Sequence, residues 1–455
     1  MTLATSNVPR RAWLVPVILG LSVFAVYSAN GREIDVGDSV PTRLAARELA
    51  LHGTAALDRD VAGYPEYGNW PSFVTGRDGH VRSAYSFLPA AAGAAVGGLL
   101  HVAGAIDLNA PRAASLVAKL TASLLTALAV VLAFLTARRR TSERRALLVA
   151  LGFGLGTGLW PTVSQTLWQH ETAIFGLMTA VWLLDRDTEE QPRLWMAGLA
   201  LGLAGMARAQ LTPAIALIAL WAALRAGTWK RALGLWPLPA CAIATAALGL
   251  AWFGHPLGPR MAMLASMPAS HLVSGSISHE PWVGMFGLLF SPNRGVFVFS
   301  PVVLVALAGL AALGGKGARA SRLRWFGAAA TIQFLTYGSF SVWWGGYGYG
   351  PRYVLDILPL VVPFAAIGVD WCGRRRATLV LAALLLVWSI GVSAIGAFCY
   401  SSSIWNTWPD DVDERHERLW QWDDLEIARC LDAGIHADTF ILFDRAAVRR
   451  PPSSR

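Results

Sequence analysis

The chain alternates long apolar runs with short polar or basic stretches. A helix needs a run of about 20 apolar residues to cross a bilayer. Some of the runs are shorter than this, and we expect them to tilt or to gain a helical turn. Together they predict an all-α polytopic membrane protein with about eleven spans. The predicted spans are 12–29, 110–136, 146–163, 172–184, 194–207, 211–224, 232–254, 297–313, 325–342, 354–369 and 377–399.

The segment 87–105 decides how the chain is threaded through the membrane. It is apolar enough to be a further span, but the basic stretch 137–145 would then lie outside. If 87–105 instead lies in the outer leaflet as a juxtamembrane helix, six inner stretches hold half of the 38 Lys and Arg residues. The positive-inside rule therefore favours eleven spans, with the N-terminus inside and the C-terminus outside. The six stretches are 1–11, 137–145, 185–193, 225–231, 314–324 and 370–376.

This topology divides the chain into a transmembrane domain, 1–399, and an extracytoplasmic tail. The first outer loop is too polar for lipid and too long for a simple turn, so it should fold over the membrane surface. Cys399 and Cys430 both fall outside, where a disulfide could form. The substantial outer pieces are the loops 30–109 and 255–296 and the tail 400–455.

The composition agrees with a membrane protein. Hydrophobic residues make up 55% of the 455 residues and charged residues only 15%, whereas soluble domains carry about 25% charge. The net charge of +9 is explained by the inner basic stretches. Since no basic stretch is interleaved with aromatic residues, nucleic acid is not an expected partner. The four cysteines form no CxxC pair, and His271, His279 and Glu280 are too loose a set to predict a metal site.

Two carboxylates directly follow the first predicted span. Asp35 and Asp38 lie at the membrane mouth, where carboxylates often act as general bases or bind cations. The alternative is structural, because Asp38 also precedes 39–51, a good amphipathic helix that it could cap. The spacing leaves both interpretations open.

Two motifs in the first outer loop resemble a known family. The first runs from Asp38 through Arg47-Glu48 to Gly53, and the second is 76–89, which leads into the apolar segment 87–105. Both resemble the first outer loop of the GT-C polyprenyl-phosphate-sugar glycosyltransferases, which include protein O-mannosyltransferases and lipid A aminoarabinose transferases. The resemblance implies a GT-C fold with juxtamembrane helices in this loop. The family's usual Asp-Glu pair is Asp38-Ser39 here, so Asp35 is kept as an alternative base.

The family's chemistry requires a base, cations and an apolar groove. A carboxylate deprotonates the acceptor hydroxyl, and cations hold the departing lipid phosphate. The resemblance implies Asp38 as the base and Arg352 as the leading phosphate ligand. Arg352 lies in a segment rich in glycine and aromatic residues, in which Trp344, Tyr349 and Tyr353 are expected to contact the sugar. The alternative is an interfacial aromatic belt with a snorkelling arginine.

Further cations and a His-Glu pair complete the candidate site. Arg208 interrupts apolar sequence between two predicted spans, and a charge there suggests a site by default. The resemblance implies donor-phosphate binding for such a basic residue. His170 and Glu171, at the outer end of another span, are candidates for contacting donor or acceptor, or else a hydrogen-bonded interfacial pair. The remaining candidate phosphate ligands are Arg112 and Lys119, seven residues apart on one helical face, and Arg294.

We therefore expect a multi-pass protein of the bacterial inner membrane with an extracytoplasmic active site. It should transfer a hexose or pentose, with inversion, from a polyprenyl-phosphate donor to a glycan, lipid or protein of the cell envelope. No cofactor is implied. The alternative is a transporter or flippase for an envelope lipid or lipid-linked sugar, which would use the same arginines to pass a phosphate. The absence of inverted repeats in the sequence and the long first loop count against that alternative. The sugar and the acceptor are not determined by the sequence.

Overall fold

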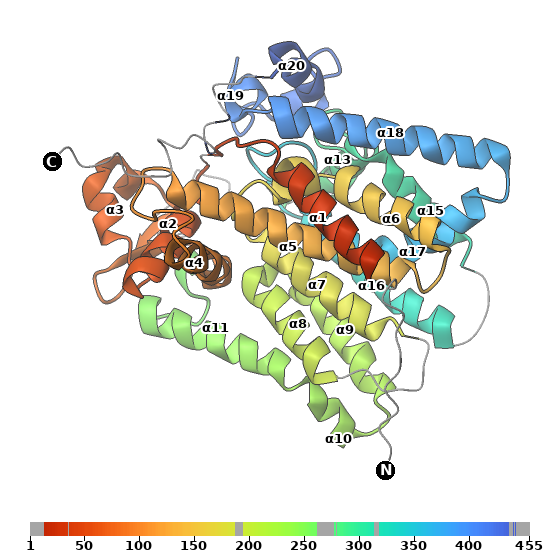
Figure 1. The fold of residues 1–455 in the computed structure, drawn as a ribbon, viewed down its shortest axis with the longest axis horizontal. Helices are drawn as coiled ribbons and strands as arrows, with labels where there is room; N and C mark the ends of the chain where they lie inside the picture. The colour runs from red at the N-terminus through yellow and green to blue at the C-terminus, as the bar shows by residue number, and fades with distance from the viewer. Residues whose placement is uncertain are drawn as a thin grey trace.

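The computed structural model describes residues 13–34, 36–186, 194–261, 277–278, 280–313, 318–435, 440 and 442. This part of the chain is mostly helical (Figure 1). Its apolar helices are α1 (Leu14–Ser28), α5 (Ala113–Ala137), α6 (Glu143–Leu155), α7 (His170–Leu184), α8 (Leu194–Ala207), α9 (Thr212–Arg225), α11 (Pro237–Phe253), α13 (Pro281–Phe290), α14 (Val296–Phe299), α15 (Leu304–Ala311), α16 (Ala318–Gly338), α17 (Leu358–Cys372) and α18 (Arg376–Cys399).

Each predicted span contains a helix, although several helices are short. Among the described residues, three stretches are long and apolar enough to cross a membrane by length and composition: α5, Arg352–Cys372 and α18. A fourth is added if α10 (Trp229–Ala232), with the turn that follows it, and α11 are counted as one bent span. The total of eleven spans and the positions of the termini remain predictions.

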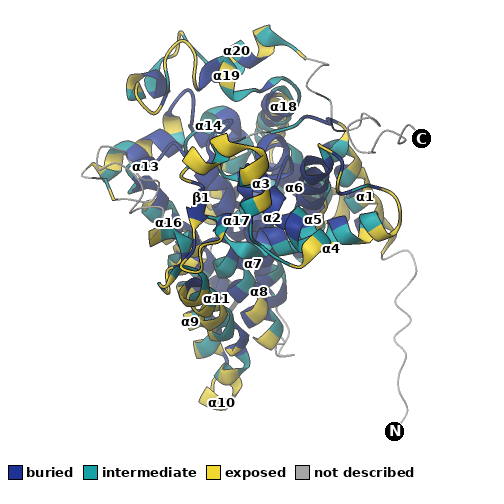
Figure 2. Cartoon of the chain, turned by 90° about the vertical axis from the view of Figure 1, so that its left-hand side faces the viewer, coloured by how far each residue is buried: buried dark blue, intermediate teal, exposed yellow. Residues whose placement is uncertain are grey.

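The core of the bundle is formed where α5 and α7 pack against their neighbours. Most residues of α5 are buried, including Ala118, Val130 and Phe134, because α1, α2, α4, α6 and α7 all contact this helix. Figure 2 shows this buried centre in dark blue, with exposed residues on α10 at its lower end. The helices around α5 thus form a fixed frame that can hold side chains from distant parts of the sequence together.

The first outer loop folds into a small layer of its own. It contains α2 (Ser39–His52), α3 (Asp58–Gly63), the antiparallel pair β1 (Phe73–Thr75) and β2 (Val81–Ser83), and α4 (Phe87–Val102). The predicted helices 39–51 and 87–105 correspond to α2 and α4, which pack on each other and on α5. The β turn meets the end of α11, where the Arg77 N–H donates to the Trp252 carbonyl at 2.8 Å.

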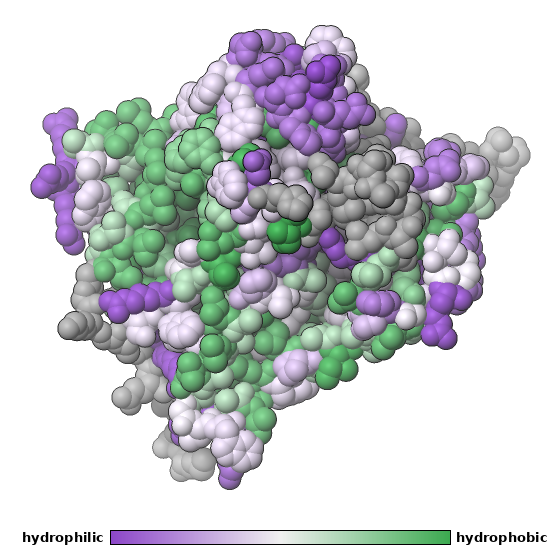
Figure 3. Space-filling view, turned by 180° about the vertical axis from the view of Figure 1, so that it is seen from behind, coloured by the Kyte–Doolittle hydropathy of each residue, from purple (hydrophilic) through white to green (hydrophobic). Residues whose placement is uncertain are grey.

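The tail lies across one end of the bundle and carries α19 (Ser402–Trp405) and α20 (Glu426–Ala433). Asn293 fastens it, because its side-chain oxygen accepts the Glu426 N–H at 2.7 Å and its amide donates to three tail carbonyls. Hydrophilic residues gather over this end in Figure 3, beside a broad hydrophobic area. Cys399 and Cys430 are both free thiols, so the suggested disulfide is absent from the structure.

Candidate active site

A cavity of about 630 Å³ opens where the first outer loop, the helical bundle and the tail meet. Apolar lining residues come mainly from α4, α8 and α11. The segment 342–353 and the tail add aromatic, glycine and charged residues to the lining. The residues that line the cavity include Asp38, Tyr85, Phe87, Gln169, Met206, Arg208, Leu248, Trp252, Phe253, Trp344, Arg352, Tyr353, Asp413 and Glu414.

Asp38 and Arg352 form an ion pair on the cavity wall. The Arg352 Nη1 lies 3.0 Å from the Asp38 Oδ2, and the aspartate side chain keeps 28% of its surface exposed. The guanidinium is held from its other side by the Trp168 ring, whose centroid lies 5.1 Å away. Asp38 stands just before α2, but its carboxylate makes no capping hydrogen bond in the described chain. The carboxylate is therefore directed at the arginine and the cavity rather than at its own helix.

Tyr85 adds a proton donor to this pair. It comes from the stretch between β2 and α4, and its hydroxyl lies 3.5 Å from the Asp38 Oδ1. Burial raises the pKa of the Tyr85 phenol well above its ordinary value, and the charge of Asp38 raises it further. The phenol therefore keeps its proton at neutral pH and can donate to the carboxylate.

Arg208 lies in the same cavity wall and has its own carboxylate. The Arg208 Nε is 2.8 Å from the Asp356 Oδ2. The Tyr337 hydroxyl donates to the same oxygen at 2.6 Å. Below the guanidinium, the Tyr353 ring centroid lies 5.8 Å from the Arg208 Cζ. Arg208 is thus a buried cation on a rigid support, with one edge toward the cavity.

His170 contacts both members of the Arg208–Asp356 pair. Its Nδ1 lies 2.7 Å from the Asp356 Oδ1, and its Nε2 lies 3.2 Å from the Arg208 Nη1. Arginine can only donate, so Nε2 must accept and the ring proton must be on Nδ1, where it is donated to Asp356. His170 therefore orients Arg208 and Asp356 and does not itself line the cavity.

Trp344 lines the cavity and is hydrogen-bonded to the tail. The Trp344 indole N–H donates to the Asp413 Oδ1 at 2.6 Å, and both residues line the cavity. Asp413 is exposed overall, but partial desolvation of its carboxyl raises the pKa of this group, and the hydrogen bond from Trp344 opposes the shift. Tail residues thus form part of the cavity wall.

The structure brings together five of the residues predicted from the sequence. Asp38, Arg352, Arg208, Trp344 and Tyr353 all line one cavity. The alternative base, Asp35, lies outside the described residues, as do His271 and His279.

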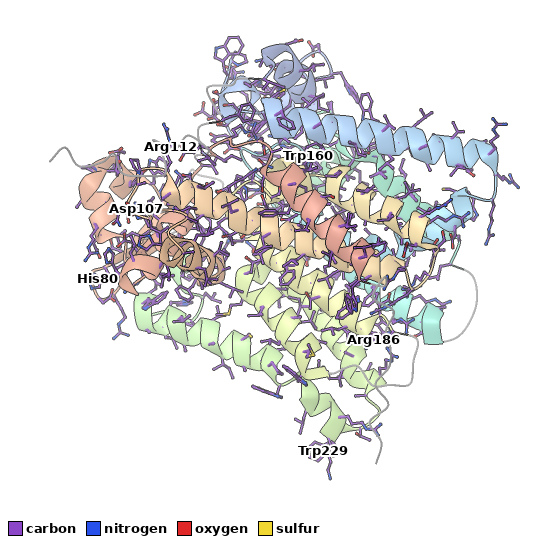
Figure 4. The ribbon with its side chains drawn as sticks, in the orientation of Figure 1. His80, Asp107, Arg112, Trp160, Arg186 and Trp229 are labelled. Atoms are coloured by element: carbon purple, nitrogen blue, oxygen red, sulfur yellow. The ribbon has the colours of Figure 1, made fainter. Side chains whose placement is uncertain are left out.

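The other predicted cations lie away from this cavity. Arg112, labelled in Figure 4, is 40% exposed at the start of α5 and lies 3.5 Å from Glu33. Lys119 is fully buried and donates to Asn30 and Gln165 at 2.8 and 2.6 Å. Arg294 is also buried, in an ion pair with the tail. Each of these three cations has a protein partner for its charge or its hydrogen-bond donors, and packing with that partner places the cation outside the cavity.

Two further predicted contacts are structural in this fold. The Tyr349 hydroxyl donates to the Val392 carbonyl at 2.9 Å. Glu171 accepts the backbone N–H groups of Trp168 and Gln169, each at 3.1 Å. It therefore closes the turn before α7.

The sequence interpretation missed several residues of the site. Asp356 follows Arg352 by four residues inside an apolar run, and a charge in such a run could have identified it. Tyr85 was included in a motif but given no role. Trp168 and Asp413 had no local signal, because only the tertiary structure places them beside Arg352 and Trp344. Within the described ranges, no three His, Cys, Asp or Glu side chains are arranged to hold a metal ion.

Comparisons with known proteins identify the fold. No protein-family model and no curated protein matches the sequence. ArnT from Cupriavidus metallidurans, crystallised with bound undecaprenyl phosphate, superposes with a TM-score of 0.50 at 15% identity, over 95% of this chain and 76% of ArnT. The archaeal oligosaccharyltransferase AglB from Archaeoglobus fulgidus, in complex with an inhibitory peptide and a dolichol-phosphate, gives a TM-score of 0.48 at 11% identity, over 92% of this chain and 60% of AglB. The chain has the GT-C fold of ArnT.

Proposed function

We propose that this protein is a membrane glycosyltransferase that takes a sugar from a polyprenyl-phosphate donor and transfers it, with inversion, to an acceptor in the bacterial cell envelope. The observation that supports this best is the Asp38–Arg352 ion pair on the wall of a large cavity. The pair supplies a base and a phosphate-binding cation at one point. The reaction would take place on the extracytoplasmic face of the inner membrane.

The shape and polarity of the cavity suit a lipid-linked donor. Phe87, Leu248 and Phe253 contribute apolar surface from α4 and α11, against which a prenyl chain could lie. Arg208 and Arg352 add guanidinium groups to the same lining, and such groups bind phosphate oxygens in a bidentate manner. The bound undecaprenyl phosphate in ArnT, which shares this fold, supports the same class of donor for this chain.

The proposed reaction uses the ion pair in two stages. When the donor binds, its phosphate competes with Asp38 for the Arg352 guanidinium. Asp38 can then accept the proton of the acceptor hydroxyl, whose oxygen attacks the anomeric carbon from the side opposite the phosphate. The bond between that carbon and the phosphate oxygen breaks, and its electrons leave with the phosphate. The second negative charge that develops on the phosphate is stabilised by Arg352 and Arg208.

Replacing Asp38 by Asn tests this assignment. The amide cannot act as a base, so the rate of sugar transfer should fall by about 10² to 10⁴-fold, which is the usual contribution of general base catalysis. Transfer can be followed by mass spectrometry of envelope glycans, with wild type or Asp38→Asn expressed in a strain that lacks the chain. Binding of a defined polyprenyl phosphate, measured in nanodiscs, should be retained.

The exposed Glu414, which lines the same cavity, provides a matched control, because Glu414→Gln removes a carboxylate without touching Arg352. Transfer at the normal rate by Asp38→Asn would rule out Asp38 as the base. If deleting the gene changed the lipid-linked pool but no glycan, the result would instead support the flippase alternative.

A further inference from the structure

The segment 343–350 determines where the Arg352 side chain is directed. It contains no helix or strand, and Gly345, Gly346 and Gly350 all have φ between +67° and +78°. A Cβ atom added to Gly345 would lie 3.5 Å from the Arg352 Cβ, and one added to Gly348 would lie 3.5 Å from its Cδ. The side chain of Arg352 thus rests on this segment, and any shift of the segment would move the guanidinium.

A buried ion pair between the bundle and the tail holds this segment in place. The Arg294 Nη1 lies 2.8 Å from the Glu426 Oε2, and both side chains are completely buried. The same Glu426 oxygen accepts the Gly350 N–H at 3.1 Å. From the other partner, the Arg294 Nη2 donates to the Gly346 carbonyl at 3.4 Å. The pair therefore binds the backbone of 343–350 at two points.

Two more tail carboxylates contact the same segment. Asp413 accepts the Trp344 indole N–H, and Asp411 accepts the Tyr347 hydroxyl. Together with Glu426, these residues attach the tail to 343–350 along its whole length. We call Asp411, Asp413 and Glu426 the tail clamp.

We propose that the Arg294–Glu426 pair is a positioning device for Arg352, and that the tail clamp is consequently part of the phosphate-binding site. A buried ion pair contributes little net stability, and hydrophobic residues of similar volume often replace one at no cost. Stability alone therefore does not explain this pair. Its contacts with Gly346 and Gly350 do, because they fix the backbone that supports Arg352. The proposal rests on the function proposed above, since it assumes that Arg352 binds the donor phosphate.

Two double variants separate positioning from folding. Arg294→Met with Glu426→Leu removes both charges and the acceptor for the Gly350 N–H. Arg294→Met with Glu426→Gln removes the same charges but keeps an amide oxygen for that N–H. The readout is the ratio of the dissociation constants for decaprenol and decaprenyl phosphate in nanodiscs, because prenyl-chain binding cancels and only the contribution of the phosphate remains.

In the leucine double variant, we expect the ratio of the dissociation constants for decaprenol and decaprenyl phosphate to fall about tenfold. This is the effect of misplacing one charge-assisted hydrogen bond. The glutamine double variant should regain most of the loss. Arg140→Gln is the matched control, because it removes a buried guanidinium from the opposite end while Asp185 keeps Arg322 at 3.0 Å. This control should discriminate like wild type. Thermal unfolding of each variant shows that only folded protein is compared.

The outcomes distinguish the two proposals. If wild type binds decaprenol and decaprenyl phosphate equally, the proposed function fails. If Arg352→Gln changes the ratio of dissociation constants, Arg352 binds phosphate. If the folded leucine double variant then shows the same ratio as wild type, the positioning inference is overturned. Should the leucine variant not fold, Tyr347→Phe detaches the segment from Asp411 alone and is expected to lose about threefold of the discrimination. Unchanged discrimination in Tyr347→Phe would then overturn the inference.

Discussion

Both ends of the helical bundle bury arginines against aspartates, and the cavity of the candidate site lies beside the arginines of one end. At the predicted inner end, Asp185 pairs with Arg140 and Arg322, near the position of Arg186 in Figure 4. At the predicted outer end, Arg208 and Arg352 border the cavity of about 630 Å³, whose lining includes none of the residues Arg140, Asp185 and Arg322. Buried charge by itself thus indicates a constraint on packing. Buried charge next to open space, with apolar residues in its lining, indicates a binding site.

The largest effect should come from neutralising the aspartate at either end. Asp356→Asn leaves Arg208 buried without its counter-ion, and Asp185→Asn does the same to Arg140 and Arg322. Each should lower the free energy of unfolding by about 3–5 kcal/mol, the usual cost of breaking a buried ion pair, measured by thermal unfolding in detergent.

Binding assays on the folded fractions of these two variants separate a role in the site from a role in packing. Asp356→Asn should also weaken decaprenyl phosphate binding, because Arg208 loses the group that orients it. Asp185→Asn should bind like wild type. Equal loss of binding in both variants would show that the effect is one of general instability.

A single arginine at each end gives the next largest effect. Arg352→Gln should weaken binding of decaprenyl phosphate by about 1.5–3 kcal/mol, the range for a hydrogen bond to a charged group, and leave decaprenol binding unchanged. Arg140→Gln should not alter either affinity. Binding can be measured by microscale thermophoresis. Undiminished phosphate binding by Arg352→Gln would remove this residue from the site.

Two glycines of the segment 343–350 should show a smaller effect, which depends on their surroundings. Gly350 has φ +67°, and an added Cβ would come within 2.6 Å of the Phe299 ring. Gly346 has φ +70° but open space around it. Gly346→Ala should therefore destabilise by about 1–2 kcal/mol through backbone strain alone, and Gly350→Ala should cost more and also weaken phosphate binding. Thermal unfolding and the binding assay test both, and equal effects would contradict the clash with Phe299.

The smallest effect concerns the titration of Asp413. Asp413 is exposed overall, but partial desolvation of its carboxyl raises the pKa of this group. Between the unfolded pKa of about 3.9 and the folded value, the native state therefore binds more protons. Stability should consequently fall as pH rises through that interval. Asp413→Asn cannot titrate but keeps an oxygen for Trp344. As pH rises, the free energy of unfolding of the variant should therefore increase relative to that of wild type, by less than about 1 kcal/mol. Parallel unfolding curves from pH 4 to 8 would contradict this sign.

The apolar pattern of the chain was sufficient to predict the helices and the outline of the first outer loop. Apolar runs become helices because a backbone in lipid must satisfy its own hydrogen bonds, and α5 and α18 follow the predicted limits within a few residues. The helices 39–51 and 87–105 were likewise predictable from amphipathic spacing and apolar length. Arg208 could be selected because its charge interrupts apolar sequence, whereas Asp38 and Arg352 were selected through the resemblance to the GT-C glycosyltransferases.

Which charges meet could not be predicted and depends on how the folded helices pack. Arg294 and Arg352 are both arginines near aromatic residues, yet one is enclosed with Glu426 and the other faces the cavity. The choice depends on which partners packing brings within 3 to 4 Å, and those partners lie up to about 300 residues away in the sequence. Local patterns record hydrophobicity and backbone preference, whereas a charge acquires its role from the carboxylates and the open space that the completed fold places beside it.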